Sequence, residues 1–215
     1  MAIDKGQFTD VTAVARALRP SYPVYCLRPD VLAASARRFI SQFPGTVLYA
    51  VKCNPHPLVL NALYKGGIRH FDTASLTEIA QVADAFEDAH TYFMHPVKAR
   101  AIIKSAWQIY GVRHFVVDHM DELNKVVQEV GAQGNTIIVR VNTPPADDAL
   151  YHLAAKFGAA PAQAVELMKE AKARGADVGL AFHVGSQCRS PQAYLTALEL
   201  LGGVIAEAGV NPVCI

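Results

Sequence analysis

Short, β-prone apolar runs alternate with longer helical patterns along most of this sequence. Between residues 47 and 136, successive runs mostly recur every 21 to 23 residues. This spacing accommodates one strand, one helix and their connections, so it predicts a parallel sheet with helical crossovers. Two architectures satisfy the pattern, a (β/α)8 barrel and an open doubly wound sheet.

The residues at the strand ends favour the barrel. An open sheet that binds a dinucleotide usually shows Gly-x-Gly-x-x-Gly after its first strand, and this sequence has none there. Polar residues instead follow nearly every strand, as they do around the mouth of a barrel. We therefore expect an α/β fold of the (β/α)8, TIM-barrel type. Strands are predicted at 24–27, 47–52, 68–73, 92–94, 114–118, 136–141, 178–184 and 212–215. Helices are predicted at 31–42, 57–64, 75–86, 97–110, 120–130, 161–174 and 190–208, and a long loop at 142–160.

Composition excludes several classes of protein. The chain has 215 residues, 52% of them hydrophobic, and a net charge of +1. It therefore has material for a core and no basic footprint for nucleic acid or an anionic membrane. Four scattered cysteines without a Cys-x-x-Cys pair indicate reduced thiols in the cytoplasm, with neither a disulfide framework nor a zinc site. No signal peptide and no apolar run long enough to span a membrane are expected.

The run 47–52 ends in a lysine, Lys52, and an Asn54-Pro55 turn follows at once. At the mouth of a parallel sheet, its stem could pack on apolar neighbours while its amine faces a cleft. Burial disfavours the charged form, so such an amine would lose its proton more readily than one in water. A neutral amine can form a Schiff base with an aldehyde. The simpler alternative is a lysine that ends a strand in solvent.

Six polar side chains are predicted at the carboxyl ends of successive strands. They are Lys52, Asp72, His95, Asp118, Arg140 and His183. In a barrel these ends meet at one mouth, where active sites are built. Several have a simpler structural explanation: Asp118 could cap a helix, Asp72 could bind turn amides, and His95 precedes Pro96 in a turn. Their convergence favours a functional site more than any single member does.

A second motif, His183-Val184-Gly185-Ser186-Gln187, follows a strand near the end of the chain. The histidine ring could lie on a planar ligand, while Ser186 and nearby amides bind a phosphate. An ordinary glycine turn with a serine cap explains the same residues. The spacing alone leaves both interpretations open.

Several motifs follow one another along this sequence, and their order is as informative as their residues. They are Tyr49-Ala50-Val51-Lys52-Cys53-Asn54-Pro55, Phe71-Asp72-Thr73-Ala74-Ser75 with Glu78, and the His183 motif. Met94-His95-Pro96-Val97-Lys98, Val117-Asp118 with Glu122-Leu123, and Lys156-Phe157-Gly158 fit the same order. Together they resemble the alanine-racemase-like (fold type III) pyridoxal-phosphate decarboxylases of basic amino acids, in particular the ornithine decarboxylase branch.

The resemblance implies a cofactor, pyridoxal 5'-phosphate, and roles for individual residues. Lys52 would hold the cofactor covalently, His183 would stack on its ring, and these two would be the catalytic residues. Ser186 would contact the phosphate. Three further residues correspond to family residues around the cofactor: Asp72, Glu78 and Arg140. No metal site is expected.

The resemblance also implies a domain organisation. Residues 1–28 would form an N-terminal segment with a strand that pairs with the family's second, β-rich domain. Residues 29–215 would form the cofactor-binding barrel, truncated in its seventh strand. The chain therefore resembles the N-terminal part of a decarboxylase and alone would be inactive. In the family, the C-terminal domain supplies a cysteine acid and a substrate-binding aspartate across a dimer interface.

For the complete enzyme, the expected reaction is decarboxylation of L-ornithine to putrescine in polyamine biosynthesis, with L-lysine as a further substrate. A cytoplasmic homodimer without nucleic-acid or membrane partners is expected. The alternatives are a catalytically inactive decarboxylase-like regulator, a diaminopimelate decarboxylase and an amino-acid racemase of the same fold.

Overall fold

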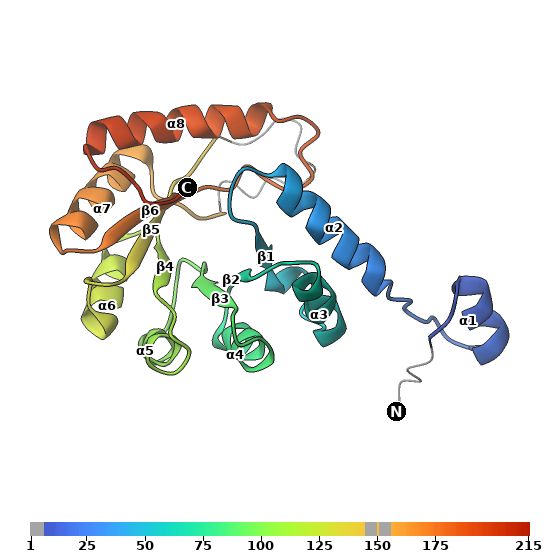
Figure 1. Ribbon diagram of the computed structural model, residues 1–215. Helices are drawn as coiled ribbons and strands as arrows, with labels where there is room; N and C mark the ends of the chain where they lie inside the picture. Colours follow the sequence, from blue (N-terminus) through green and yellow to red (C-terminus); the bar gives the residue numbers. More distant parts are fainter. Residues whose placement is uncertain (1–6, 145–149, 151–155) are drawn as a thin grey trace.

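The computed structural model describes residues 7–144, 150 and 156–215. Its centre is a six-stranded parallel sheet in chain order, β1-β2-β3-β4-β5-β6. The strands are β1 (Leu48–Ala50), β2 (His70–Thr73), β3 (His90–Phe93), β4 (His114–Val117), β5 (Thr136–Arg140) and β6 (Asp177–Ala181). The helices are α1 (Val11–Leu18), α2 (Pro29–Gln42), η1 (Val51–Cys53), α3 (Pro57–Lys65), α4 (Leu76–Ala85), α5 (Arg100–Gln108), α6 (Met120–Val130), α7 (Pro161–Ala173) and α8 (Gln192–Ala208). The strands form a curved sheet with the helices on its outside, as in part of a (β/α)8 barrel (Figure 1).

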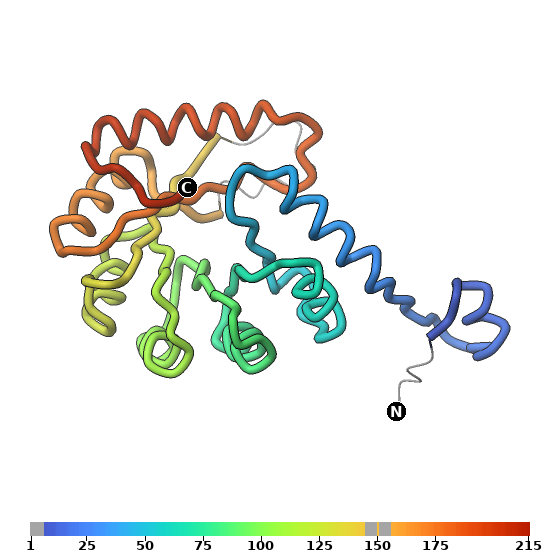
Figure 2. Tube along the Cα trace, in the orientation of Figure 1, coloured from blue at the N-terminus to red at the C-terminus, as the bar shows by residue number. Residues whose placement is uncertain are grey.

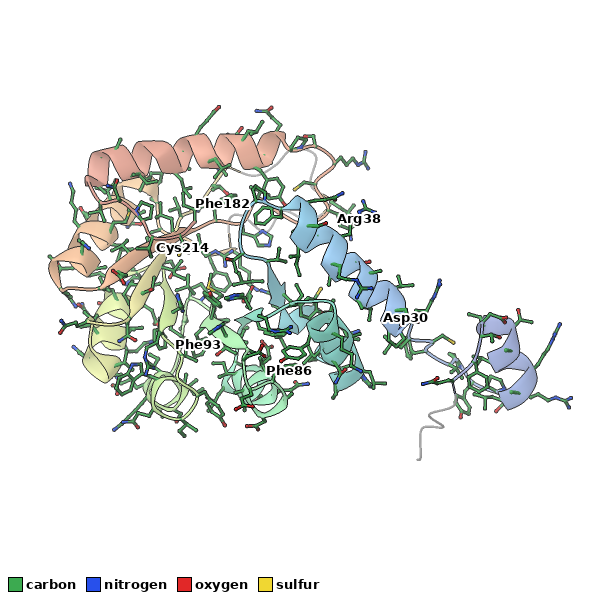
Figure 3. All side chains as sticks on the ribbon, viewed as in Figure 1. Asp30, Arg38, Phe86, Phe93, Phe182 and Cys214 are labelled. Atoms are coloured by element: carbon green, nitrogen blue, oxygen red, sulfur yellow. The ribbon has the colours of Figure 1, made fainter. Side chains whose placement is uncertain are left out.

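In β2 and β3, alternation along the strand separates an outer, buried face from a more polar inner one, whereas β4 and β5 are buried on both faces. Phe71, Phe93 and Phe115 are almost completely buried among residues of the surrounding helices. Their neighbours His70 and Tyr92 are only half-buried on the opposite face. Figure 3 shows the side chains that fill the space between strands and helices, with Phe86 and Phe93 labelled. Burial of the outer face holds the helices in place and leaves the inner face for chemistry.

The run at 212–215, predicted as a seventh strand, lies beside β6 without forming a regular strand. The Val213 amide donates to the Val178 carbonyl (2.8 Å), and the Leu180 amide donates to the Cys214 carbonyl (3.0 Å). A Cβ at Gly179 would lie 2.6 Å from the Cys214 sulfur. Glycine at this position therefore allows Cys214 to pack against β6 (Figure 3).

The N-terminal segment differs from the sequence expectation. Helix α1, which was not predicted, begins at the N-cap Asp10 and buries none of its residues. It stands apart from the sheet at the end of an extended connection (Figure 2). Residues 24–27, predicted as a strand, form neither helix nor strand, and Tyr25 is fully exposed. A strand needs a partner for its backbone groups, and residues 24–27 have no neighbouring strand among the described residues. Their pairing with a second domain stays a prediction.

Most helices lie where they were predicted. One helix begins later than expected, and one strand ends earlier. The helix predicted at 97–110 begins only at Arg100, because residues 94–99 form the connection from β3. The strand predicted to end at Lys52 ends at Ala50, and the next three residues form the 3-10 turn η1. No helix in the described ranges is long and apolar enough to cross a membrane.

Candidate active site at the carboxyl ends of the strands

Four of the predicted residues lie together at the carboxyl edge of the sheet. Asp72 is on β2, opposite Ala50 of β1, and Lys52 follows in η1. Arg140 is the last residue of β5, opposite Ala181 of β6, and His183 follows two residues later. The charges of Lys52 and Arg140 influence both Asp72 and His183. The curvature of the sheet thus brings its first and last strands to one site.

Lys52 is exposed, which corrects the expectation that its stem would be buried. The turn η1 explains the difference, because it ends β1 before the lysine. Val51 occupies the buried position, with no exposed surface, and Lys52 is left on the open side. Its amine is therefore accessible from solvent, as attack on an aldehyde requires.

Asp72 carries a carboxylate whose ionised form is disfavoured by burial. Burial raises its pKa and Glu78 raises it further, although Lys52 and Arg140 act in the opposite direction. Its buried Oδ1 atom has no hydrogen-bond partner among the described residues. A buried acceptor without a donor costs free energy, so this atom marks a position where a ligand donor would be stabilised.

His183 presents a neutral ring to the same site. Its Nδ1 atom accepts a hydrogen bond from the Gly185 amide (2.9 Å), which leaves the ring proton on Nε2. Burial lowers its pKa, and the nearby cations Arg140 and Lys52 lower it further. The Thr143 hydroxyl also donates to the His183 carbonyl (3.3 Å). The ring is therefore uncharged at neutral pH, and its orientation is fixed by its own turn.

Ser186 and Glu78 lie on the connections that border the site. Ser186 is half-buried in the turn after Gly185, where Gln187 adopts a left-handed conformation (φ 57°). The Glu78 amide donates to the hydroxyl of the N-cap Ser75 (3.2 Å). The Glu78 Oε2 accepts from the amide of Ala74 (2.7 Å), one residue before the N-cap, so the start of α4 has one side-chain cap and not a reciprocal capping box. Glu78 thus has a structural role in addition to its electrostatic effect on the neighbouring aspartate. The phosphate contact of Ser186 stays a prediction.

Arg140 is the half-buried cation in the middle of the site. Burial lowers its pKa, while Asp118 and Asp72 raise it. Among the described residues it forms no ion pair. Its guanidinium carbon lies 5.4 Å from the centre of the Phe157 ring. Asp118 and Asp72 therefore act on Arg140 at longer range, and the Phe157 ring is the near neighbour of its guanidinium group.

The two remaining strand-end candidates have local partners. The His95 Nδ1 atom lies within its own turn, 2.7 Å from the Val97 carbonyl oxygen and 3.1 Å from the Val97 amide nitrogen, and bonds to one or the other according to the tautomer of the ring. Asp118 does not cap α6, since His119 is the N-cap. The Asp118 carboxylate instead accepts from the Gly158 amide (3.0 Å). These residues shape the wall of the site.

Sequence reasoning missed two features near the site. Phe157 was recognised only as part of a motif, although its ring contacts Arg140 and His95. The buried ion pair between Lys98 and Glu122 (3.0 Å) was not expected. Both residues stand among other polar residues in the sequence, as in His119-Met120-Asp121-Glu122, so no local pattern indicates their burial.

The comparisons with known proteins identify the family. Residues 30–211 match the family model "Pyridoxal-dependent decarboxylase, pyridoxal binding domain". The chain belongs to this family. The matched range contains every residue of the candidate site, so the site lies within the pyridoxal-binding domain.

Individual relatives agree with this assignment. A lysine/ornithine decarboxylase from Selenomonas ruminantium is 36% identical over 164 residues, which cover 75% of this chain and 40% of that protein. An antizyme inhibitor 2 from Xenopus laevis is 34% identical over 165 residues, covering 75% and 35%. The lysine/ornithine decarboxylase of Vibrio vulnificus, solved in complex with putrescine, is 30% identical with a TM-score of 0.75, covering 94% and 53%. The chain thus spans well under half of these two curated relatives and about half of the solved structure.

The residues present fit pyridoxal phosphate. The site offers an accessible amine for the aldehyde, a neutral imidazole for the ring, and the turn after His183 for the phosphate. The Asp72 Oδ1 atom, which has no partner among the described residues, leaves an acceptor for a donor group on a ligand. No group of three metal-ligating side chains occurs in the part of the chain that the structure describes.

Proposed function

We propose that this chain carries the cofactor site of a decarboxylase that converts L-ornithine to putrescine and also accepts L-lysine. The observation that supports this most is the convergence of Lys52, Asp72, Arg140 and His183 at one edge of the sheet. The relatives named for ornithine and lysine support the substrate class. Ornithine as the preferred substrate is part of the proposal.

Each residue of the site has its own role in the proposed reaction. When bound, pyridoxal phosphate accepts the electron pair that remains when the α-carboxylate leaves as carbon dioxide. The accessible Lys52 amine would hold the cofactor through its aldehyde. The neutral His183 ring supports the flat cofactor without adding a charge beside it. Arg140 and Asp72 set the local charge, and the Ser186 turn holds the phosphate.

The proposal extends to the assembled protein. We infer a homodimer of the full-length protein in the cytoplasm, taking part in polyamine biosynthesis. Four free thiols support a reducing compartment. The dimer rests on the family resemblance, and sedimentation of the full-length protein at several concentrations tests it.

Borohydride trapping tests the cofactor site directly. The protein is mixed with pyridoxal phosphate, reduced and mapped by mass. We expect a single adduct on Lys52, lost in Lys52→Ala and kept in Lys65→Ala, a control on the exposed last turn of α3. Adducts spread over many lysines would contradict the assignment of Lys52.

A carbon dioxide assay on the full-length protein separates the alternatives. Release from carboxyl-labelled ornithine that disappears in Lys52→Ala supports the decarboxylase. The similarity to an antizyme inhibitor makes an inactive regulator the second candidate. Trapping at Lys52 without carbon dioxide release from ornithine or lysine would favour that regulator. Loss of optical activity without gas release would indicate a racemase, and release from diaminopimelate alone would indicate the decarboxylase of that substrate.

A further inference from the structure

We propose that Phe157 is a positioning residue whose ring holds Arg140 at the carboxyl edge of the sheet, next to His183. The role in cofactor binding rests on the proposed function, whereas the positioning itself does not. Nothing in the family match assigns a role to this phenylalanine. Three sets of contacts support one.

The first set fixes Ala159, two residues after Phe157, to the strand that carries Arg140. The Ala159 amide donates to the Arg140 carbonyl (2.8 Å), and the Asn142 amide donates to the Ala159 carbonyl (2.8 Å). Val141 and Ala159 form an isolated parallel bridge. The chain is therefore attached to the end of β5 within two residues of Phe157.

The second set fixes the turn at Gly158. Its amide donates to the Asp118 carboxylate at the end of β4 (3.0 Å). Its φ of 111° suits glycine, and a Cβ would lie 2.6 Å from the Asn142 nitrogen. A side chain at this position would force the segment away from β5. Phe157 thus precedes a residue that is anchored on two strands.

The third set orients the ring. The Arg140 guanidinium carbon lies 5.4 Å from the ring centre, within the range of a cation–π contact. His95 approaches the same ring edge-on, with centroids 5.6 Å apart at 68°. The Lys156 amine lies 5.3 Å from the ring centre. The His95 ring is itself held by its turn, so it provides a fixed neighbour for the Phe157 ring.

This arrangement matters because Arg140 has a long side chain and no ion pair among the described residues. Its charge acts on Asp72, Asp118 and His183. An arginine that left Phe157 would move its charge relative to all three groups. The ring therefore controls where the positive charge of the site is placed.

A double-mutant cycle on His183 tests the proposal. The pKa of His183 is measured by NMR titration in the wild type, Phe157→Leu, Arg140→Gln and the double variant. Since Arg140 lowers this pKa, both single variants should raise it. Phe157→Leu should add nothing in the Arg140→Gln background. Phe157→Tyr, which keeps the aromatic face, should leave the pKa unchanged.

Cofactor affinity provides the second readout. Phe157→Leu should weaken pyridoxal phosphate binding by about twofold to fivefold, the range of an exposed cation–π contact, and Phe157→Tyr should not. An unchanged His183 pKa in a folded Phe157→Leu variant would overturn the proposal, and so would additive pKa changes in the cycle. A wild type that binds no cofactor would contradict the proposed function instead, and the titration would still decide the role of Phe157.

Discussion

The raised pKa of Asp72, despite two neighbouring cations, shows which effect dominates at this residue. Burial disfavours the carboxylate more than Lys52 and Arg140 stabilise it, and its Oδ1 atom has no donor among the described residues. A group that costs stability and stays at the site is typical of residues retained for function. The Asp72 carboxylate therefore lowers the stability of the ligand-free protein and offers an acceptor to a ligand.

Asp72→Asn should increase stability at pH 7 by about 1 kcal/mol, since it removes an unfavourable buried charge. The folded-state pKa is raised, so ionisation costs stability only at pH values above the unfolded-state pKa. The gain should therefore shrink as the pH falls toward 4. Urea unfolding at pH 7 and pH 4 measures it, with Asp84→Asn, an exposed position on α4, as the control. A destabilised Asp72→Asn at pH 7 would contradict this balance.

At the scale of elements, a buried ion pair connects three parts of the fold. Lys98, in the connection between β3 and α5, lies 3.0 Å from Glu122 in the first turn of α6. Its amine also donates to the carbonyls of Val116 on β4 (2.6 Å) and His95 (3.1 Å). Burial lowers the pKa of Lys98 to about 8, although Glu122 acts to raise it. The pair therefore holds the His95 turn against the sheet.

Lys98→Met should destabilise the protein by about 3 kcal/mol, because it removes the buried ion-pair partner of Glu122. Among the described residues, Glu122 keeps its ion pair with Lys125 and the hydrogen bond from the backbone amide of residue 98. The double variant Lys98→Met/Glu122→Leu should recover most of the loss. Chemical denaturation measures both. Arg100→Met, which breaks the more exposed pair with Glu129, is the control and should cost less than about 1 kcal/mol. Equal losses for the two pairs would argue against a structural role for Lys98.

Local patterns predicted the elements better than they predicted the site. The strand and helix positions followed from short apolar runs and from helical periodicity, whose signals lie within a few residues. The exposure of Lys52 depends on a 3-10 turn that moves Val51 into the core, and no local pattern distinguishes that turn from one more strand residue. The contact of Phe157 with Arg140 joins residues whose backbones meet only through sheet pairing. Such contacts require the register of the folded chain.

At the scale of the whole molecule, the inner face of the sheet has two polar regions. The candidate site lies at the carboxyl edge, and a histidine cluster lies toward the amino edge. In this cluster the His70 and His90 rings stack 5.0 Å apart, His70 Nδ1 lies 3.0 Å from the Tyr92 hydroxyl, and the Tyr92 and His114 rings lie 4.3 Å apart. Burial raises the pKa of Tyr92, and the nearby Cys214 raises it further. Burial lowers the pKa of His70 and His114, and neighbouring histidines lower both further.

This cluster makes stability depend on pH. For His70 and His114 the folded-state pKa is below the unfolded value, so the unfolded chain binds more protons. Their stabilising effect should be complete above about pH 6.5 and should decline as the pH falls below it. Urea unfolding between pH 7.5 and 5 should show a shallower pH slope in His114→Phe than in the wild type. His119→Asn, at an exposed N-cap, should keep the wild-type slope. Identical slopes in all three proteins would contradict the prediction.

The strictly sequential order of the sheet has a consequence for biosynthesis. Because each strand pairs only with those next to it in the chain, the sheet can grow on the ribosome one unit at a time, without waiting for distant partners. The cofactor site cannot follow the same schedule, since Lys52 emerges early and His183 comes after the sixth strand. A nascent chain would therefore carry an accessible amine while residues 53–182 are made, before the imidazole of the candidate site appears. Capture of pyridoxal phosphate in its final geometry thus has to wait for translation of the segment that follows β6.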